Sequence, residues 1–301
     1  MNEILVNGMV VGKEYGEVIP LGTYFKTDEC SASAPFIIYD GSIYHMWYSG
    51  EDVNRYRIHY ATSEDGVNWI KHGPIKILVD NDINYDLHEY DPSIIFDGSI
   101  FHMWYCGGDD VKGVYYATSE DGMIWKKQCI AVKVGDKGES DYLSIKTPFV
   151  TFDGSIYHMW YTGDSIIGDS IGYERIHYAT SLDGRNWKKH GVVQTLCTND
   201  VDKYHISKPF VIYDNGVHHM WYNYNFNNIN KLLYATSTDG KNWTKLSDPI
   251  STLTKDGNIK YNIIRPFIIK DENLYKIWFN KCFSVGCSIH YAELSESSIV
   301  K

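Results

Sequence analysis

The fold of this 301-residue chain can be read from the stretch PFIIYDGSIYHMWY (residues 35–48), in which a hydrophobic run, an Asp-Gly turn and an aromatic run follow one another. Similar stretches begin at Pro92, Pro148, Pro209 and Pro266, with spacings of 57, 56, 61 and 57 residues. A Tyr-Ala segment follows each of them. The runs alternate with a period of two and are rich in Ile, Tyr, Phe and Trp, as β-strands are. Repeats of this length predict four-stranded blades with their loops.

Asp-Gly pairs mark the first turn in three of the repeats, and the looser sequences Asp214-Asn215-Gly216 and Asp271-Glu272-Asn273 take this place in the fourth and fifth. The first pair, as at Asp40-Gly41, lies between the two strand-like runs, and Asp-Gly supplies the positive φ angles of a two-residue hairpin turn. A second pair follows the Tyr-Ala segment in four copies, with a Trp four residues after its Asp. These second turns begin at Asp65, Asp121, Asp183 and Asp239. Two hairpins per copy predict an all-β, five-bladed β-propeller of four-stranded antiparallel blades.

The fifth copy ends near Leu294 without a second Asp-Gly turn or a following Trp, so its outermost strand is missing from the C-terminal end. The apolar residues near the N-terminus are expected to supply this strand, over residues 3–11. Such a strand would close the ring and remove an exposed sheet edge. Residues 1–301 are then predicted to form one propeller domain, with blades starting near residues 35, 92, 148, 209 and 266.

Composition and charge restrict the classes of function. The net charge of −10 and the lack of a basic stripe disfavour nucleic acid as a partner. The chain has no basic, hydrophobic leader and no apolar run of membrane-spanning length, which predicts no membrane partner. Its six cysteines form no C-x-x-C pair and no even framework across the blades, which favours reduced cysteines and a cytoplasmic location. The oligomeric state is left open.

The repeat separates structural residues from candidate functional ones. All nine tryptophans occupy two positions of the repeat, and a residue required in every blade is expected to pack between blades. Most histidines also occupy repeat positions, as His45 and His59 do, and a ring holds equivalent positions apart, so no metal site is expected from them. Function is expected where the copies differ, in the loops before each first strand and between the second and third strands.

The residue directly before each leading Pro differs from blade to blade. In chain order these residues are Ala34, Asp91, Thr147, Lys208 and Arg265. Glu89 and Asp91 are two residues apart, which places them on one side of an extended segment. Lys146, Lys208 and Arg265 make the opposite part of the channel mouth basic. One interpretation is a ring of ion pairs that stiffens the channel, and the other is a site for a polar or anionic ligand.

Aromatic and imidazole side chains of the same loops are candidates for sugar binding. Because every Trp belongs to the repeat, tyrosines are the expected platforms for a pyranose ring. The loop tyrosines are Tyr24, Tyr85, Tyr90, Tyr142, Tyr204 and Tyr261. His88 and His205 lie in these loops, outside the repeat positions of the other histidines. They are expected to bind substrate hydroxyls, and holding a central cation is the less expected alternative.

The Asp-Gly hairpins, the Tyr-His-Met-Trp-Tyr strand and the Tyr-Ala-Thr-Ser-x-Asp-Gly-x-x-Trp unit resemble those of the five-bladed β-propeller glycosidase superfamily, over all five blades. This superfamily includes glycoside hydrolase families 32, 43 and 130. In families 32 and 43 the resemblance implies an Asp before the first-blade Pro, an Asp before the second-blade Pro, and a Glu two residues before the third-blade Pro. Only the second is present, as Asp91, while Ala34 and Lys146 occupy the other positions. Hydrolysis ordinarily needs two carboxylates, and Asp28 or Glu29 from the first-blade loop would have to replace those missing.

The mannoside phosphorylases of family 130 fit these charges better. They are similar in fold, use one carboxylic acid and hold inorganic phosphate with basic side chains, and the segment 89–93 resembles their acidic residue before a Pro. The resemblance implies that Asp91 donates the proton, with Glu89 as the second candidate. The three basic residues of the mouth would bind phosphate or an acidic sugar through charge-assisted hydrogen bonds. Lys146 beside Asp91 would lower the pKa of that carboxyl and make it a poorer acid.

Two classes of function remain open. The first is a carbohydrate-active enzyme that acts on a glycosidic bond by hydrolysis, phosphorolysis or transfer, with no cofactor other than inorganic phosphate as a co-substrate. The second is a propeller that binds a saccharide or an acidic glycan without turning it over. A small saccharide or glycan is the expected partner in both.

Overall fold

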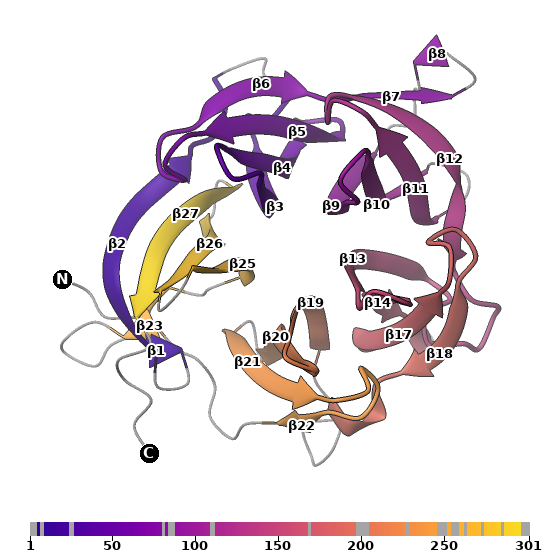
Figure 1. Ribbon diagram of the computed structural model, residues 1–301. Coiled ribbons are helices and arrows are strands. Elements are labelled where there is room, and N and C mark those ends of the chain that lie inside the picture. Colours follow the sequence, from indigo (N-terminus) through magenta and orange to yellow (C-terminus); the bar gives the residue numbers. More distant parts are fainter. Residues whose placement is uncertain are drawn as a thin grey trace.

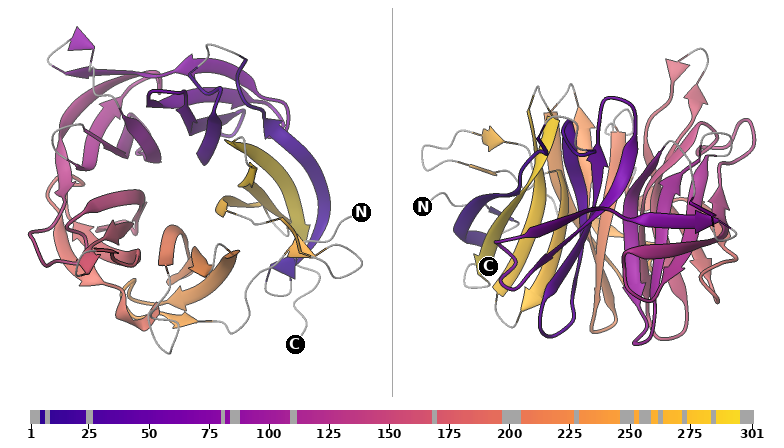
Figure 2. Two further views of the ribbon diagram at one scale, coloured as in Figure 1. Left: turned by 180° about the vertical axis from the view of Figure 1, so that it is seen from behind. Right: turned by 90° about the horizontal axis from the view of Figure 1, so that it is seen from above.

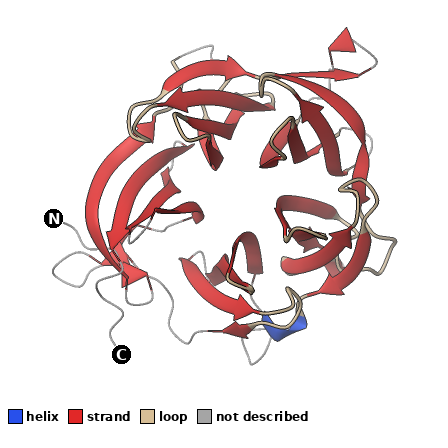
Figure 3. Cartoon of the chain, viewed as in Figure 1, coloured by secondary structure: helices blue, strands red, loops and turns tan. Residues whose placement is uncertain are grey.

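Five blades form a ring around a central channel in this computed structural model (Figure 1). The structure describes residues 5–6, 9–23, 27–79, 82–83, 88–108, 112–167, 170–196, 205–226, 229–245, 252–253, 259–261, 264–271, 274–283 and 286–295. Within these ranges the only helix is the short 3-10 turn Gln194–Leu196, so the prediction of an all-β, five-bladed propeller is confirmed (Figure 3).

In each blade the first strand faces the channel and the last lies at the rim (Figure 1). Blade 1 contains β3 (Ser31–Tyr39), β4 (Tyr44–Glu51), β5 (Tyr56–Ser63) and β6 (Ile70–Pro74). Blade 2 contains β9 (Glu89–Phe96), β10 (Phe101–Gly107), β11 (Gly113–Ser119) and β12 (Ile124–Lys133). Blade 3 contains β13 (Ser144–Phe152), β14 (Tyr157–Asp164), β17 (Arg175–Ser181) and β18 (Lys188–Val192). Blade 4 contains β19 (His205–Asp214), β20 (Val217–Phe226), β21 (Ile229–Ser237) and β22 (Thr244–Lys245).

Blade 5 is built from both ends of the described chain. Its strands are β25 (Ile264–Asp271), β26 (Leu274–Phe283), β27 (Gly286–Ser295) and β2 (Met9–Ile19). Strand β2 pairs antiparallel with β27 from Val10↔Ser295 to Ile19↔Ile289, and the two strands lie side by side in both views of Figure 2. The predicted closure by an N-terminal strand is confirmed, but the strand is later than the expected range 3–11, because β1 (Leu5–Val6) folds back on β2 instead.

Short additional strands lie outside the five-blade pattern. The parallel partner of β12 is β7 (Lys76–Val79), which also pairs with β8 (Asp82–Ile83) and so extends blade 2 at its rim. The other short strands are β15 (Ile166–Ile167), β16 (Ser170–Ile171), β23 (Thr252–Leu253) and β24 (Ile259–Tyr261). They form two small two-stranded sheets of their own.

Among the described residues, tryptophan side chains connect four of the five blades to the next one. Trp160 on β14 is fully buried, and its indole N–H donates to the carbonyl of Gly240 in blade 4 at 2.8 Å. The same glycine carbonyl accepts the indole N–H of Trp243 in its own blade at 2.9 Å. The bond between blades recurs from Trp47 to Gly122, from Trp104 to Gly184 and from Trp278 to Gly66. The prediction that the repeated tryptophans pack between blades is confirmed.

Replacing Trp160 with Ala is expected to lower the free energy of unfolding by about 3–5 kcal/mol, because the change leaves a large cavity and removes one of the two hydrogen bonds that the Gly240 carbonyl accepts. Denaturant unfolding followed by circular dichroism measures this loss. Trp69→Ala is the matched control, since Trp69 donates only to Gly66 of its own blade and is partly exposed. A smaller loss for Trp160 than for Trp69 would contradict the role of the inter-blade bond.

The repeated histidines also have structural partners. The ring nitrogens of His45 lie 2.6 Å from the Tyr60 hydroxyl and 3.1 Å from the Asp40 carboxylate. His102 and His158 have the same two kinds of partner in blades 2 and 3. Each histidine thus ties its Asp-Gly turn to the third strand of its blade, as expected from its place in the repeat.

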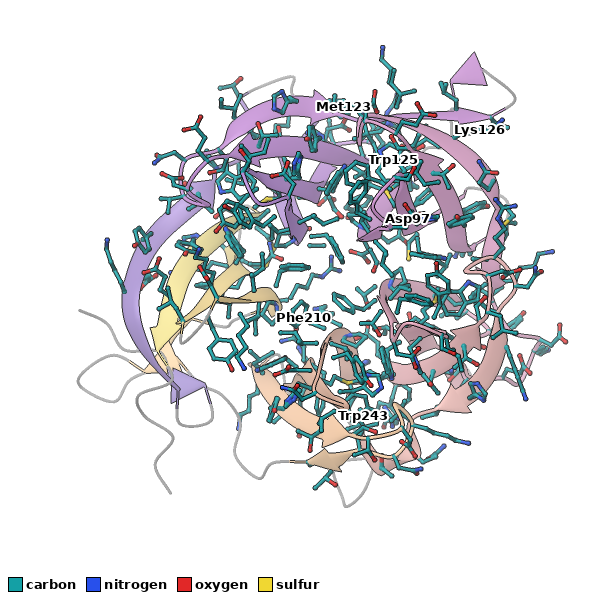
Figure 4. All side chains as sticks on the ribbon, viewed as in Figure 1. Asp97, Met123, Trp125, Lys126, Phe210 and Trp243 are labelled. Carbon is teal, nitrogen blue, oxygen red and sulfur yellow. A yellow bond between two sulfur atoms is a disulfide. The ribbon has the colours of Figure 1, made fainter. Side chains whose placement is uncertain are left out.

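Phenylalanine rings fill the channel below its mouth. Phe36, Phe149, Phe210 and Phe267 each follow a leading Pro, and their ring centroids lie 4.8–5.8 Å apart between neighbours. Phe210 lies near the axis of the ring in Figure 4. Blade 2 has Ser93 at this position, and its hydroxyl accepts the N–H of Val150 at 2.9 Å. For a ligand that enters from the mouth, this layer of rings forms the floor of the site.

One disulfide corrects the expectation of unpaired cysteines. Cys282 on β26 and Cys287 on β27 stand directly opposite each other in the register and are bonded. Pairing of the two strands brings these cysteines together, although their spacing in the sequence is not that of a C-x-x-C motif. Cysteine usage therefore no longer supports a reducing compartment, and the cytoplasmic location stays a prediction. No helix in the part of the chain that the structure describes is long and apolar enough to cross a membrane.

Candidate functional site at the channel mouth

Five β-bulges place the residue before each leading Pro at the channel mouth. All five have left-handed backbone conformations, and the strand register shifts at each of them. Their φ angles are 52° for Ala34, 53° for Asp91, 48° for Thr147, 59° for Lys208 and 51° for Arg265. This conformation is unfavourable for a residue with a Cβ atom, and more so before proline. The bulges line the channel with these five residues, as the sequence predicted for their position.

A polar side chain of the preceding blade holds four of the five bulges in place. It belongs to the residue two positions after the second-strand Trp, and it accepts the N–H of the bulge residue. These bonds are Asp91 N to Ser49 at 2.8 Å, Lys208 N to Thr162 at 3.0 Å, Arg265 N to Asn223 at 3.1 Å and Ala34 N to Asn280 at 3.0 Å. The strained backbone is therefore held by hydrogen bonds from outside each strand.

The bulge of blade 3 is held by Asp91 instead. The equivalent side chain in blade 2 is Cys106, whose thiol lies 3.6 Å from the carbonyl of Ile145. The N–H of Thr147 donates to Oδ2 of Asp91 at 3.1 Å. Among the described residues, Asp91 is thus the one bulge residue whose side chain accepts the backbone N–H of another bulge residue.

The second oxygen of the Asp91 carboxylate is bonded to a cation. Oδ1 accepts a hydrogen bond from the Arg265 guanidinium, which crosses the channel mouth from blade 5. Asp91 is 4% exposed, so water screens this pair poorly. Both oxygens of the Asp91 carboxylate are therefore hydrogen-bonded, one to Arg265 and one to the Thr147 N–H.

Lys208 lies in the same site, but its ammonium has no carboxylate partner among the described residues. Among the described residues no carboxylate lies within 4.0 Å of its ammonium. Although the side chain is partly exposed to the channel, the surrounding protein desolvates the ammonium, and the positive charge of Arg265 adds to this effect. Together they lower the pKa of Lys208 to about 8.

This pKa predicts how anion binding depends on pH. Lys208 loses its charge as the pH rises through about 8, whereas a bound anion favours the charged form. Sulfate affinity is therefore expected to fall above pH 8 by up to about tenfold per pH unit. Titrations at several pH values measure this slope, and Lys208→Arg, which stays charged, should remove it. A wild-type affinity that stays constant across this range would contradict the prediction.

Three basic residues and Asp91 line one cavity of about 410 Å³. Its charged and aromatic lining consists of Glu51, Tyr56, Tyr90, Asp91, Lys146, Lys208 and Arg265. The sequence predicted all of these except Glu51 and Tyr56. A hydrogen bond joins these two, and burial together with this bond raises the pKa of Tyr56 to about 12.

A comparison of repeat positions could have found Glu51. It stands four residues after the second-strand Trp, where the other blades have Gly108, Asp164, Asn225 and Cys282. The position differs in every blade, as the pre-proline position does. Variation between blades at this position is therefore the sequence signal that points to Glu51.

Lys146 has different partners from those expected. Its ammonium lies 2.6 Å from the Asp164 carboxylate and 3.5 Å from that of Glu174. Burial disfavours its charged form, but the hydrogen bond and charge of Asp164 outweigh this effect and raise the pKa of Lys146. The expectation that Lys146 is the cation acting on Asp91 is corrected, because Arg265 occupies that place.

A second cavity, of about 500 Å³, adjoins the first and shares Tyr56, Tyr90 and Lys146 with it. His88 and His205 line this second cavity. The ring nitrogen Nδ1 of each accepts a backbone N–H, from Tyr56 at 3.4 Å and from Glu174 at 3.2 Å. Both histidines therefore lie at the channel mouth as predicted, beside aromatic residues that suit a sugar.

Asp28 lies in a separate, buried cluster. Its Oδ2 accepts the Tyr48 hydroxyl at 2.9 Å and lies 2.5 Å from the Lys71 ammonium. Blade 3 repeats this arrangement around Asp141, which like Asp28 lies seven residues before its leading Pro. Asp28 is therefore part of the repeat, and the cavity that it lines is a different one from that of Asp91. Its role as a replacement catalyst stays a prediction that this placement does not favour.

Glu29 and Glu89 also do not line the two cavities of the mouth as far as the structure describes them. Glu89 is buried, with a carboxylate oxygen 4.0 Å from the guanidinium of Arg57. The expectation that Glu89 and Asp91 share one side of the strand is corrected. The bulge at Asp91 breaks the alternation, and Tyr90 and Asp91 face the same cavity instead.

The remaining tyrosine candidates are not among the described residues that line the two cavities. Tyr142 is partly exposed and its backbone N–H donates to Glu139 at 3.3 Å. Tyr24, Tyr85 and Tyr204 lie outside the described residues, as does the side chain of Tyr261. No group of three His, Cys, Asp or Glu side chains in the described part of the chain has an arrangement suited to a metal ion.

Comparisons with known proteins find the same fold in solved structures. A solved structure named as a glycoside hydrolase matches 94% of this chain and 91% of its own, with a TM-score of 0.72 and 17% identity. A structure from work on the GH130 family of mannoside phosphorylases, which contains glycoside hydrolases that target β-1,2 mannosidic linkages, matches 97% and 96%, with a TM-score of 0.67 and 17% identity. Other neighbours include hydrolases of families 43, 62 and 32. The fold implied by the resemblance is confirmed, while the incomplete carboxylate set stays a prediction.

Sequence comparison finds partial relatives. The uncharacterized protein MT1551 of Mycobacterium tuberculosis is 31% identical over 121 residues, which are 38% of this chain and 40% of that protein. The 1,2-beta-oligomannan phosphorylase of Thermoanaerobacter sp. is 28% identical over 116 residues, which are 34% of this chain and 38% of the enzyme. The chain thus spans about 40% of the length of the curated relatives that it matches. No family model matches it.

Proposed function

We propose that this protein is a carbohydrate-active enzyme that cleaves a glycosidic bond at the channel mouth with inorganic phosphate as the attacking group. The observation that carries the proposal is the shared cavity of Asp91, Lys208 and Arg265. It offers Asp91 as an acid and two cations for phosphate, while the other carboxyl group of the cavity, Glu51, is bonded to Tyr56. Ala34 and Lys146 occupy the positions where the resemblance implies the other carboxylates of a hydrolase.

In the proposed reaction, protonated Asp91 donates its proton to the glycosidic oxygen as the bond to the anomeric carbon breaks. A phosphate oxygen forms the new bond to that carbon, which yields a sugar phosphate and an alcohol. The proton that phosphate gives up returns to Asp91. Lys208 and Arg265 hold phosphate by charge-assisted hydrogen bonds, and Tyr56 and Tyr90 provide aromatic faces for the sugar.

A propeller that binds a saccharide without turnover is the second candidate, and one observation favours it. Both oxygens of the Asp91 carboxyl group have partners, the N–H of Thr147 and the Arg265 guanidinium, and this arrangement offers a saccharide no free acid. A saccharide carrying an acidic group would then bind to Lys208 and Arg265 without a proton donor.

Turnover of mannosides with and without phosphate separates these candidates. β-1,2-linked mannosides come first, because the partial relative from Thermoanaerobacter is an oligomannan phosphorylase. We expect phosphate-dependent release of a mannose phosphate, with a rise in KM for phosphate of roughly tenfold or more in Lys208→Met. Turnover that needs no phosphate and is lost in Glu51→Gln would identify a hydrolase. Saccharide binding without any turnover would support the second candidate.

A further inference from the structure

The ion pair between Asp91 and Arg265 joins the proposed acid to one of the proposed phosphate ligands. The two side chains come from β9 and β25, on separate blades. While they are paired, neither can perform its proposed role. Both oxygens of the Asp91 carboxylate accept hydrogen bonds, and the guanidinium hydrogen bond that a phosphate would accept goes to Oδ1 of Asp91.

Lys208 supplies the means of breaking this pair. Its ammonium lies in the same cavity and has no carboxylate within 4.0 Å in the described part of the site. An oxyanion that binds there lies beside Arg265, whose positive charge acts on Lys208. A guanidinium binds phosphate or sulfate through two parallel hydrogen bonds, and a doubly charged anion attracts it more strongly than one carboxylate does.

The charges around Asp91 would change sign on this exchange. The guanidinium moves from the carboxylate to the anion, and the anion adds negative charge nearby, so both effects favour the protonated carboxyl. The other titratable or charged groups facing the site are Glu51, Tyr56, Tyr90, Cys106, Lys146 and Glu174. Burial raises the pKa values of Tyr56, Tyr90 and Cys106, which keeps them neutral near pH 7. The charge of Lys146 is offset by Asp164 and Glu174.

We propose that an oxyanion bound to Lys208 and Arg265 breaks the ion pair between Arg265 and Asp91 and lets Asp91 take up a proton from solvent. This inference rests on the proposed function, and it makes phosphate both the attacking group and the trigger that prepares the acid. Without the anion, the enzyme would hold Asp91 ionised and would not protonate a bound saccharide. Water would then be a poor substitute for phosphate in the reaction.

Sulfate binding tests the exchange without any sugar, since sulfate does not titrate near neutral pH and mimics a phosphate dianion. Calorimetric titrations at about pH 6.5, in buffers of different ionisation enthalpy, report the protons taken up with each anion. Lys208 is already charged at this pH and does not contribute. We expect proton uptake by the wild type and none by Asp91→Asn.

The Asp91→Asn variant gives a second readout. Its amide oxygen can still accept the Thr147 N–H, so the bulge of blade 3 keeps its support. Because the carboxylate no longer competes for Arg265, sulfate should bind roughly tenfold more tightly or better. Glu51→Gln is the matched control, since it removes a charge from the same cavity but from a residue bonded to Tyr56 and not to Arg265. It should bind sulfate less tightly than Asp91→Asn does and retain proton uptake.

Three outcomes would overturn the inference: no sulfate binding to the wild type, binding without proton uptake, or no gain in affinity for Asp91→Asn over Glu51→Gln. None of these outcomes decides whether the protein uses phosphate, which the turnover assay measures separately. Conversely, the wild type could take up protons on sulfate binding while its turnover does not depend on phosphate. That result would overturn the proposed function and still support the ion-pair exchange.

Discussion

Removal of residues 1–19 should abolish cooperative folding. This change deletes β2, the outer strand of blade 5, and with it the closure of the ring on β27. Ile19 is fully buried and the Tyr15 ring packs 5.0 Å from that of Tyr291, so the deletion exposes the core of the blade and a long sheet edge. The expected loss exceeds about 5 kcal/mol, which is comparable with the whole stability of many domains. Thermal unfolding followed by circular dichroism and light scattering would measure it.

A peptide of residues 9–19 added in trans is the control for this deletion. If β2 acts by pairing with β27, the peptide should restore a cooperative transition in a concentration-dependent way. A scrambled peptide of the same composition should not. A truncated protein with the melting temperature of the full chain would show that closure by β2 does not stabilise the propeller.

Asp91→Asn should lower turnover by about 10²- to 10⁴-fold, the range for loss of a general acid. The variant keeps the shape of the side chain and its bond to Thr147, so stability should change little. Steady-state kinetics on the phosphate-dependent substrate, together with the melting temperature, would measure both effects. A fall in kcat with a stable fold is the expected pattern, because the interaction lost is made in the transition state.

Asp97→Asn is the matched control for this variant. Asp97 lies in the same blade at the far end of the strand, where it accepts the N–H groups of Ser99 and Ile100 (Figure 4). The same chemical change there should leave kcat within a fewfold of wild type. Full activity in Asp91→Asn would remove Asp91 as the acid and direct attention to Glu89, the second candidate from sequence.

Repetition explains why so much of the fold was predictable. Packing between equivalent blades demands the same residue at the same position, so Trp47 and its counterparts could be assigned without coordinates. The same comparison of blades separates the loop residues of the scaffold from those of the site. Asp28 has a counterpart in Asp141 and so belongs to the scaffold, whereas Glu51 stands at a position that differs in every blade and lines the cavity.

Bulges and pairings at the mouth limited the prediction of the site. A period of two placed Glu89 beside Asp91, and the left-handed residue before Pro92 separated them. Charge alone placed Lys146 near Asp91, but Asp164 and Glu174 hold its ammonium instead. Neither outcome follows from local sequence, because each depends on which strands of different blades meet.

By itself the sequence determined the five-bladed ring, the inter-blade role of its tryptophans and the set of differing residues before the leading prolines. These follow from periodicity, which is a property of the chain alone. Only the tertiary structure decided that Arg265 and not Lys146 pairs with Asp91, that Lys208 lacks a carboxylate partner among the described residues, and that Cys282 bonds Cys287. Contacts across the channel join residues as far apart as 174 positions, and their choice of partner depends on distances that only the closed ring establishes.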